Sequence, residues 1–126
     1  MSLIEWDDNT LSVGVDILDN QHKILVGLIN KLSKYIENEK PTTAINKLFK
    51  ELVEYTQYHF NTEETYFERL NNKDLHLHKL QHKHLLEQLN SFMKQSPPRV
   101  TPEILDFLLD WFVIHVQCED KKFIQG

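Results

Sequence analysis

Four stretches of the chain repeat apolar residues at steps of three and four, the spacing that lines one face of an α-helix. These stretches predict helices over residues 19–38, 42–70, 75–94 and 101–123, and Asp19 is the expected N-cap of the first. No stretch alternates polar and apolar residues over the length of a strand. The pattern therefore predicts an all-α protein.

Short polar breaks separate the four helices, at residues 39–41, 71–74 and 95–100. Pro41 and Pro102 suit first helical turns and cannot occupy helix interiors without cost. Short connections favour antiparallel neighbours, so we expect an up-down-up-down four-helix bundle that forms one domain over residues 1–126. We expect residues 1–18 to form an extended arm, with Trp6 packed over one end of the core.

Composition narrows the classes of partner and compartment. Lys plus Arg number 14 and Asp plus Glu 19, for a formal net charge of -5. This acidic balance argues against nucleic acid or an anionic membrane as a partner. A single cysteine, Cys118, excludes an intramolecular disulfide and suits a reducing compartment. With no secretory signal and no apolar run that could span a bilayer, we expect a cytoplasmic monomer, unless the chain is a piece of a larger membrane-attached protein.

Histidine is the unusual residue, because seven occur and each predicted helix carries at least one on its apolar stripe. The second helix also places Glu63 four residues after His59, so both project from the same face. Burying a histidine and a carboxylate is costly unless something satisfies them. The core-facing candidates are His22, His59, Glu63, His78, His82 and His115, with Glu119 and Asp120 just beyond. We expect His76 and His84, which fall on other faces, to be solvent-exposed.

A metal centre is the partner that such a set of side chains fits best. Imidazole and carboxylate without thiolate suit iron, manganese, zinc or copper. Five histidines with carboxylates exceed the four ligands of a tetrahedral zinc, and they fit two metal ions bridged by carboxylates. No side chain is left over as a general base. The composition of the site therefore favours binding of a small ligand over oxidation of a substrate, and we predict no catalytic residues and no enzyme activity.

The motifs around these ligands cover nearly the whole chain, in residues 13–23, 59–64, 78–82 and 111–120. In their order and spacing they resemble the hemerythrin family, and most closely the short single-domain bacteriohemerythrins. The resemblance implies an up-down-up-down bundle that holds two non-haem iron ions joined by an oxo or hydroxo bridge. It implies seven iron ligands, namely His22, His59, Glu63, His78, His82, His115 and Asp120.

The resemblance also assigns the roles of these ligands. The last three histidines would hold one saturated iron, the first two would hold an iron with an open position, and both carboxylates would bridge. Spacing on an ideal helix favours Glu119, four residues after His115, whereas the resemblance selects Asp120. We expect Glu64, turned about 100° from Glu63 on an ideal helix, to be solvated.

Reversible dioxygen binding for storage, transport or delivery is the function that the resemblance implies. The alternatives are a module that senses oxygen or redox state, and an iron-handling or nitric oxide-responsive di-iron protein. Phe112 departs from the family, which usually has leucine facing the oxygen pocket at this position. Its ring would either narrow the pocket or pack between helices, and the sequence leaves both open.

Overall fold

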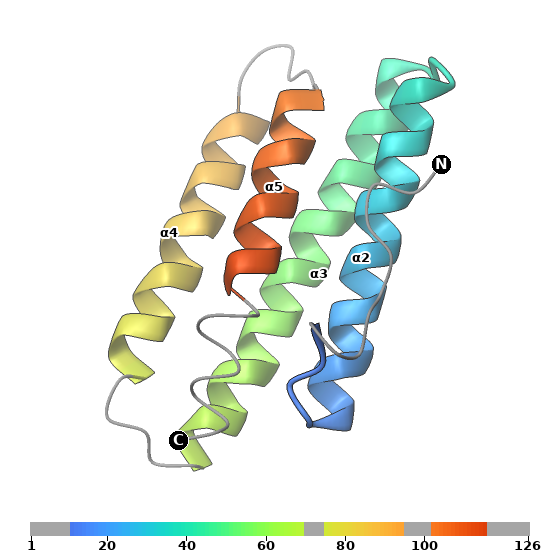
Figure 1. Cartoon of the computed structure of the whole chain (residues 1–126). Helices are drawn as coiled ribbons and strands as arrows, with labels where there is room; N and C mark the ends of the chain where they lie inside the picture. The colour runs from blue at the N-terminus through green and yellow to red at the C-terminus, as the bar shows by residue number, and fades with distance from the viewer. Residues whose placement is uncertain (1–10, 70–74, 95–101, 116–126) are drawn as a thin grey trace.

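The computed structural model describes residues 11–69, 75–94 and 102–115. Within them lie four helices, α2 (Asp16–Glu37), α3 (Thr42–Arg69), α4 (Leu75–Met93) and α5 (Pro102–Ile114). Figure 1 shows them side by side, each antiparallel to the one before. Helix α3 packs against α2 and α4, while α2 also packs against α5. The predicted all-α bundle is therefore confirmed.

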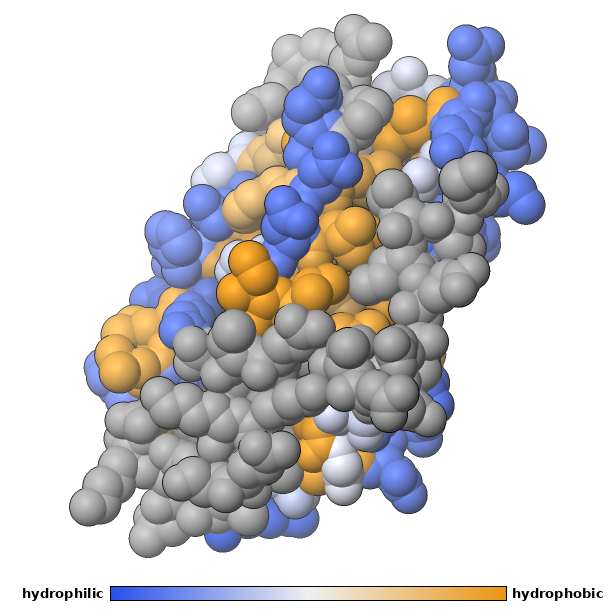
Figure 2. All heavy atoms as spheres, viewed as in Figure 1, coloured by the Kyte–Doolittle hydropathy of each residue, from blue (hydrophilic) through white to orange (hydrophobic). Residues whose placement is uncertain are grey.

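Each helix turns its apolar stripe inward, and the stripes meet in one continuous core. Burial of this apolar surface supplies the main driving force for folding. In Figure 2 hydrophobic residues show between the helices, and hydrophilic ones cover much, but not all, of the outer surface. The core side chains with at most 2% exposure are Leu18, Leu32, Phe49, Leu52, Phe60, Phe67 and Leu85.

The start of α2 differs from the prediction. The helix begins at Asp16, three residues early, and its N-cap residue Val15 makes no capping hydrogen bond through its side chain. Asp19 is therefore not the N-cap. Its carboxylate instead accepts hydrogen bonds from the Ser12 hydroxyl (2.6 Å) and the Val13 backbone N–H (2.8 Å). Through these bonds Asp19 holds the segment that precedes α2 against the first turns of the helix. The helix dipole also favours an acidic residue near the N-terminus.

The turn between α2 and α3 reverses the chain in a few residues. Glu39 adopts φ 53°, in the left-handed region that favours glycine. The N–H of Glu39 donates to the Ile36 carbonyl, and the N–H of Lys40 donates to the Tyr35 carbonyl. These two bonds form a Schellman motif, which satisfies carbonyls at the helix end. Pro41 directly precedes α3, and its carbonyl accepts hydrogen bonds from the N–H groups of Ala44 and Ile45 in the first turn of that helix.

Several predictions concern segments whose structure is not described. The arm was predicted over residues 1–18; Trp6 lies outside the described residues, and 16–18 already belong to α2. The last predicted helix is seen as α5, but its continuation from 116 to 123 lies outside, as do Cys118, Glu119 and Asp120. In the part of the chain that is described, no helix combines the length and apolarity needed to cross a bilayer.

Candidate metal centre

Six of the seven predicted ligands lie buried together in the bundle. All four described helices or their ends contribute, and side-chain exposure does not exceed 6% for any of the six: His22, His59, Glu63, His78, His82 and His115. The seventh, Asp120, lies outside the described residues. His76 and His84 are exposed, as predicted. The helical spacing therefore predicted which histidines would face the core.

The first group joins three imidazoles from α4 and the end of α5. His78, His82 and His115 each offer a ring nitrogen, and these three atoms lie within 4.8 Å of one another. Nε2 of His82 is 3.1 Å from Nε2 of His115. The His78 ring centroid lies 4.4 Å from that of His82 and 4.7 Å from that of His115. Three nitrogen donors thus converge on one point, as ligands of a single ion do.

The second group joins α2 and α3. His22, His59 and Glu63 also offer ligand atoms within 4.8 Å of one another. Nε2 of His59 lies 2.7 Å from Oε1 of Glu63, and the His22 and His59 ring centroids are 4.5 Å apart. The i, i+4 spacing on α3 brings the imidazole and the carboxylate together, as the sequence indicated.

Glu63 lies between the two groups. Its Oε2 is 3.8 Å from Nε2 of His22, in the second group. Its Oε1 is 3.9 Å from Nε2 of His82, in the first group. The same Oε1 lies 2.7 Å from Nε2 of His59 in the second group, so this oxygen faces histidines of both groups. The placement fits a bridge between two cations.

A hydrogen bond behind His59 indicates which ring nitrogen faces Glu63 as an acceptor. The Gln21 amide donates from Nε2 to the Thr62 hydroxyl (3.4 Å), which leaves Oε1 as the acceptor for Nδ1–H of His59 (2.7 Å). With its proton on Nδ1, neutral His59 presents a lone pair on Nε2 to the Glu63 carboxylate, 2.7 Å away. Two acceptors at this distance need a positive charge between them, either a proton or a metal ion. The donor set therefore fits a bound metal.

Glu64 corrects one prediction, since it is not simply solvated. Its side chain is 23% exposed, and Oε2 lies 3.0 Å from Nδ1 of His82 on the neighbouring helix. Burial raises the pKa of Glu64 above its usual value, while Lys79 and His78 oppose the shift. A carboxylate on the outer nitrogen fixes the tautomer of a ligating histidine and its ring orientation.

Sequence reasoning did not assign a role to Gln21 and expected Glu64 to be solvated. The sequence contained part of the information needed, because both residues stand next to a predicted ligand. Gln21 precedes His22, and Glu64 follows Glu63. A position adjacent to a core-facing ligand is turned about 100° from it on an ideal helix, so it can reach a neighbouring helix. Its partner, however, depends on how the helices pack.

Aromatic rings hold the imidazoles in place. Phe60 stacks on His82 with centroids 3.7 Å apart and an interplanar angle of 1°. Trp111 stacks on His115 at 4.4 Å and 15°. Phe112 meets the His22 ring edge-on at 5.6 Å. These contacts restrict ring rotation and surround the site with apolar material.

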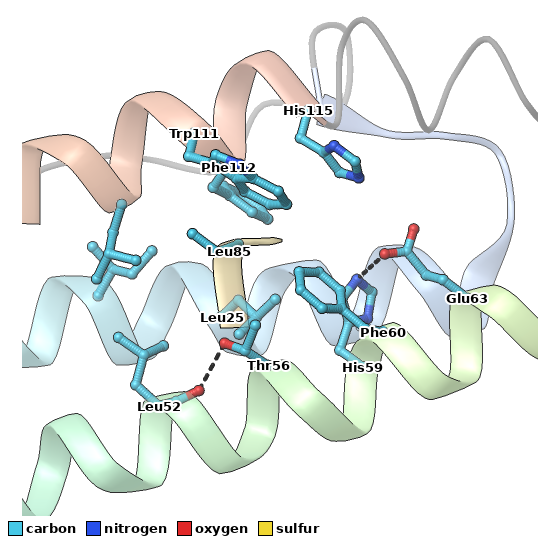
Figure 3. Close-up of a pocket in the computed structure, with 12 residues that line it drawn as sticks. Leu25, Leu52, Thr56, His59, Phe60, Glu63, Leu85, Trp111, Phe112 and His115 are labelled. Atoms are coloured by element: carbon cyan, nitrogen blue, oxygen red, sulfur yellow. Dashed lines mark hydrogen bonds and ion pairs between the residues drawn. The ribbon is translucent and has the colours of Figure 1, made fainter. Parts of the chain in front are cut away.

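A small cavity of about 30 Å³ opens beside Glu63. In Figure 3 the polar groups, His59, Glu63 and His115, gather at one end of the residues that line it. The Thr56 hydroxyl donates to the Leu52 carbonyl (2.7 Å), so it is already satisfied. The remaining lining is apolar: Leu25, Ile29, Leu52, Phe60, Leu85, Leu108, Trp111 and Phe112. Phe112 lines the cavity and also belongs to the buried core of the bundle, so the two alternatives that the sequence left open do not exclude each other.

The sequence and the fold of this chain are both similar to those of known proteins. Residues 13–125 match the family model described as the Hemerythrin HHE cation binding domain. A bacteriohemerythrin of Clostridium acetobutylicum is 30% identical, over 94% of this chain and 97% of that protein. One of Pseudomonas aeruginosa is also 30% identical, over 100% and 82%. The crystal structure of a wild-type hemerythrin superposes with a TM-score of 0.92 at 26% identity, covering 98% of this chain and 97% of that one.

Proposed function

The chain belongs to the hemerythrin family, and from this premise we propose that it binds dioxygen reversibly at two non-haem iron ions held inside the bundle. The observation that carries the proposal is the buried Glu63 carboxylate between two groups of histidines, next to a cavity of about 30 Å³. Bound as a pair, iron ions supply the electrons and the open position that dioxygen needs.

We assign the ligands in two sets. His78, His82 and His115 hold one ion, and His22 and His59 hold the other. Glu63 bridges the two. Asp120, assigned as the second bridge from the family pattern, completes the proposed set.

The cavity suits a small apolar ligand. A space of about 30 Å³ exceeds the roughly 10–15 Å³ that one water-sized molecule needs, and apolar walls give water few partners. The aliphatic and aromatic lining keeps solvent away from the polar end, where His59, Glu63 and His115 lie. Exclusion of water protects a bound ligand from side reactions.

Reversible binding also fits the lack of a further acid or base among the described residues that line the cavity. Among the described residues that line it, the titratable ones are His59, Glu63 and His115, and all three are assigned to the metal ions. General acid–base catalysis would need a further group within hydrogen-bond reach of a substrate. The lining therefore favours holding a ligand over transforming it.

Metal analysis combined with spectroscopy tests the proposal. We expect two iron ions per chain and a visible charge-transfer band that appears on exposure of the anaerobically reduced protein to air and fades when oxygen is removed. A colourless protein loaded with zinc that ignores air would refute the proposal. Nitric oxide binding without a reversible response to oxygen would point to the nitric oxide-responsive alternative.

Replacing His59 with Ala tests the ligand assignment. We expect His59→Ala to reduce bound iron from two ions per chain to one or fewer, because the imidazole and the orientation of Glu63 are both lost. The measurement is iron content after anaerobic loading. His84→Ala serves as the matched control, since His84 is exposed on α4 and should leave the iron content unchanged. Equal iron content in both variants would contradict the assignment.

A further inference from the structure

The two histidine groups differ in the charge of the residue behind them. Behind His59 lies a neutral amide, with Gln21 Oε1 at 2.7 Å from Nδ1. Behind His82 lies a carboxylate, with Glu64 Oε2 at 3.0 Å from Nδ1. Both contacts reach the outer ring nitrogen, on the side away from the neighbouring ligand atoms at Nε2. The geometry of the two contacts is alike, and the charge is not.

We propose that Glu64 and Gln21 are positioning residues that polarise the centre, so that the ion held by the three histidines is the more electron-rich and the more easily oxidised of the two. This inference rests on the proposed function, because it concerns the same pair of ions. It goes further by assigning the asymmetry of the centre to two side chains that are not ligands.

Hydrogen bonding explains the direction of the effect. A charged acceptor forms a stronger bond to an imidazole N–H than a neutral one does. That bond pulls the proton away from the ring and raises the basicity of the other nitrogen, which donates to the metal. His82 therefore becomes a stronger donor than His59, and a stronger donor favours the more highly charged, oxidised state of its ion.

Charge balance acts in the same direction. The Glu63 carboxylate is shared, because its Oε1 lies 2.7 Å from Nε2 of His59 and 3.9 Å from Nε2 of His82. Glu64 adds a further negative charge behind His82, whereas the residue behind His59 is the neutral Gln21. Its side chain is only 23% exposed, so solvent screens this charge incompletely.

Lys79 forms its ion pair with Glu68, although its charge also lowers the pKa of Glu64. Lys79, on the same side of α4, has its ammonium 2.7 Å from the Glu68 carboxylate, which lies one turn further along α3. Glu68 is 54% exposed, and no described hydrogen bond links it to an imidazole. Two glutamates on successive turns of one helix thus provide a test residue and its control.

Glu64→Gln removes the charge while keeping the size of the side chain and an acceptor oxygen. In the iron-loaded protein we expect the ferric-to-ferrous ratio at a fixed potential to fall about tenfold, a rise of about 59 mV in midpoint potential for a one-electron couple. Spectroelectrochemical titration measures it. Glu68→Gln makes the same change of net charge and should leave the potential unchanged. Gln21→Glu should shift the potential in the opposite direction.

A second measurement does not depend on iron or oxygen. Metal-free protein is titrated with Co(II) and followed by its visible absorption. Loss of an outer hydrogen-bond partner costs about 10–100-fold in metal affinity, and we expect a loss near the lower end for Glu64→Gln because the amide still accepts. Glu68→Gln should bind Co(II) as the unmodified chain does.

The outcomes separate the inference from the function. If Glu64→Gln matches Glu68→Gln in potential and in Co(II) affinity, the inference is wrong while the proposed function stands. If the unmodified chain binds Co(II) but shows no reversible oxygen band, the function fails and the Co(II) affinities decide the inference. A chain that takes up neither Fe(II) nor Co(II) overturns both.

Discussion

Phe112 connects the cavity to the histidine groups. The side chain is 6% exposed, it lines the cavity, and its ring meets the His22 ring edge-on at 5.6 Å. A side chain in this position has two effects, because it fills the core of the bundle and forms the wall beside the proposed binding position. Both effects come from its size.

Removing the ring should cost stability. We expect Phe112→Ala to lower the free energy of unfolding of the metal-free protein by about 3–5 kcal/mol, the range for a buried phenylalanine. Denaturant titration measures it. Phe107→Ala on the same helix is the control, because Phe107 is 42% exposed and its loss should cost far less. Similar losses for both variants would show that Phe112 does not contribute to the core as described.

For the candidate site, the sequence predicted which way side chains point better than it predicted which residues they contact. Helical spacing indicated which histidines face the core, and six predicted ligands do converge. The prediction for Glu64 was wrong because an angle on an ideal helix gives a direction and not what lies there. Nδ1 of His82 lies there, and only the packing of α3 against α4 supplies it. That the converging side chains bind metal stays a prediction.

At the scale of elements, the connection between α2 and α3 contains the non-glycine residue with a positive φ among the described residues. Glu39 holds φ 53°, although an L-residue with a side chain pays for this conformation. The Schellman hydrogen bonds from Glu39 and Lys40 hold it there. The strain is tolerated because the short turn lets α2 and α3 pack along their length.

Glycine at position 39 should relieve this strain. The left-handed conformation costs an L-residue about 1–2 kcal/mol, of which greater freedom of glycine in the unfolded chain offsets about 0.4–1 kcal/mol. We therefore expect Glu39→Gly to stabilise the protein by about 0.5–1 kcal/mol in denaturant unfolding. Glu51→Gly, at an exposed position inside α3, should instead destabilise by about 1 kcal/mol. Destabilisation by both changes would contradict the role given to the turn.

Most of the described helix ends followed closely from the sequence. The prediction placed the second and third helices within one residue of α3 and α4. It failed at the start of α2, where Asp19 was read as a cap. An acidic residue near a helix start can either cap the helix backbone or bind the segment that precedes the helix. Asp19 does the latter, because its carboxylate accepts hydrogen bonds from Ser12 and Val13.

For the whole molecule, the six converging side chains join all four described helices or their ends at one place. Buried polar groups of this kind cost free energy in the metal-free protein, because transfer from water is not fully compensated. A metal that binds the folded chain and not the unfolded one stabilises the fold by mass action. A metal bound here would therefore cross-link the helices as well as form a binding site.

Removal of metal should lower thermal stability. At a free metal concentration 100 times the dissociation constant, binding adds about 2.7 kcal/mol. For a chain of this length that corresponds to a rise of about 10 °C in melting temperature. Calorimetry of iron-loaded and chelator-treated protein measures the difference. The shift should shrink in His78→Ala, and identical melting temperatures in the unmodified chain with and without iron would contradict the cross-link.

The outer contacts of the centre have a consequence for protein design. Gln21, beside His22 on α2, supports His59 on α3, and Glu64, beside Glu63 on α3, supports His82 on α4. Helices α2 and α3 thus each carry a proposed ligand and, one residue away, a brace for a proposed ligand on the next helix. A graft of the centre into an artificial bundle should transplant adjacent pairs and not single ligands. Such a graft would also need the neighbouring helices in their native register, because each brace reaches across to a different helix.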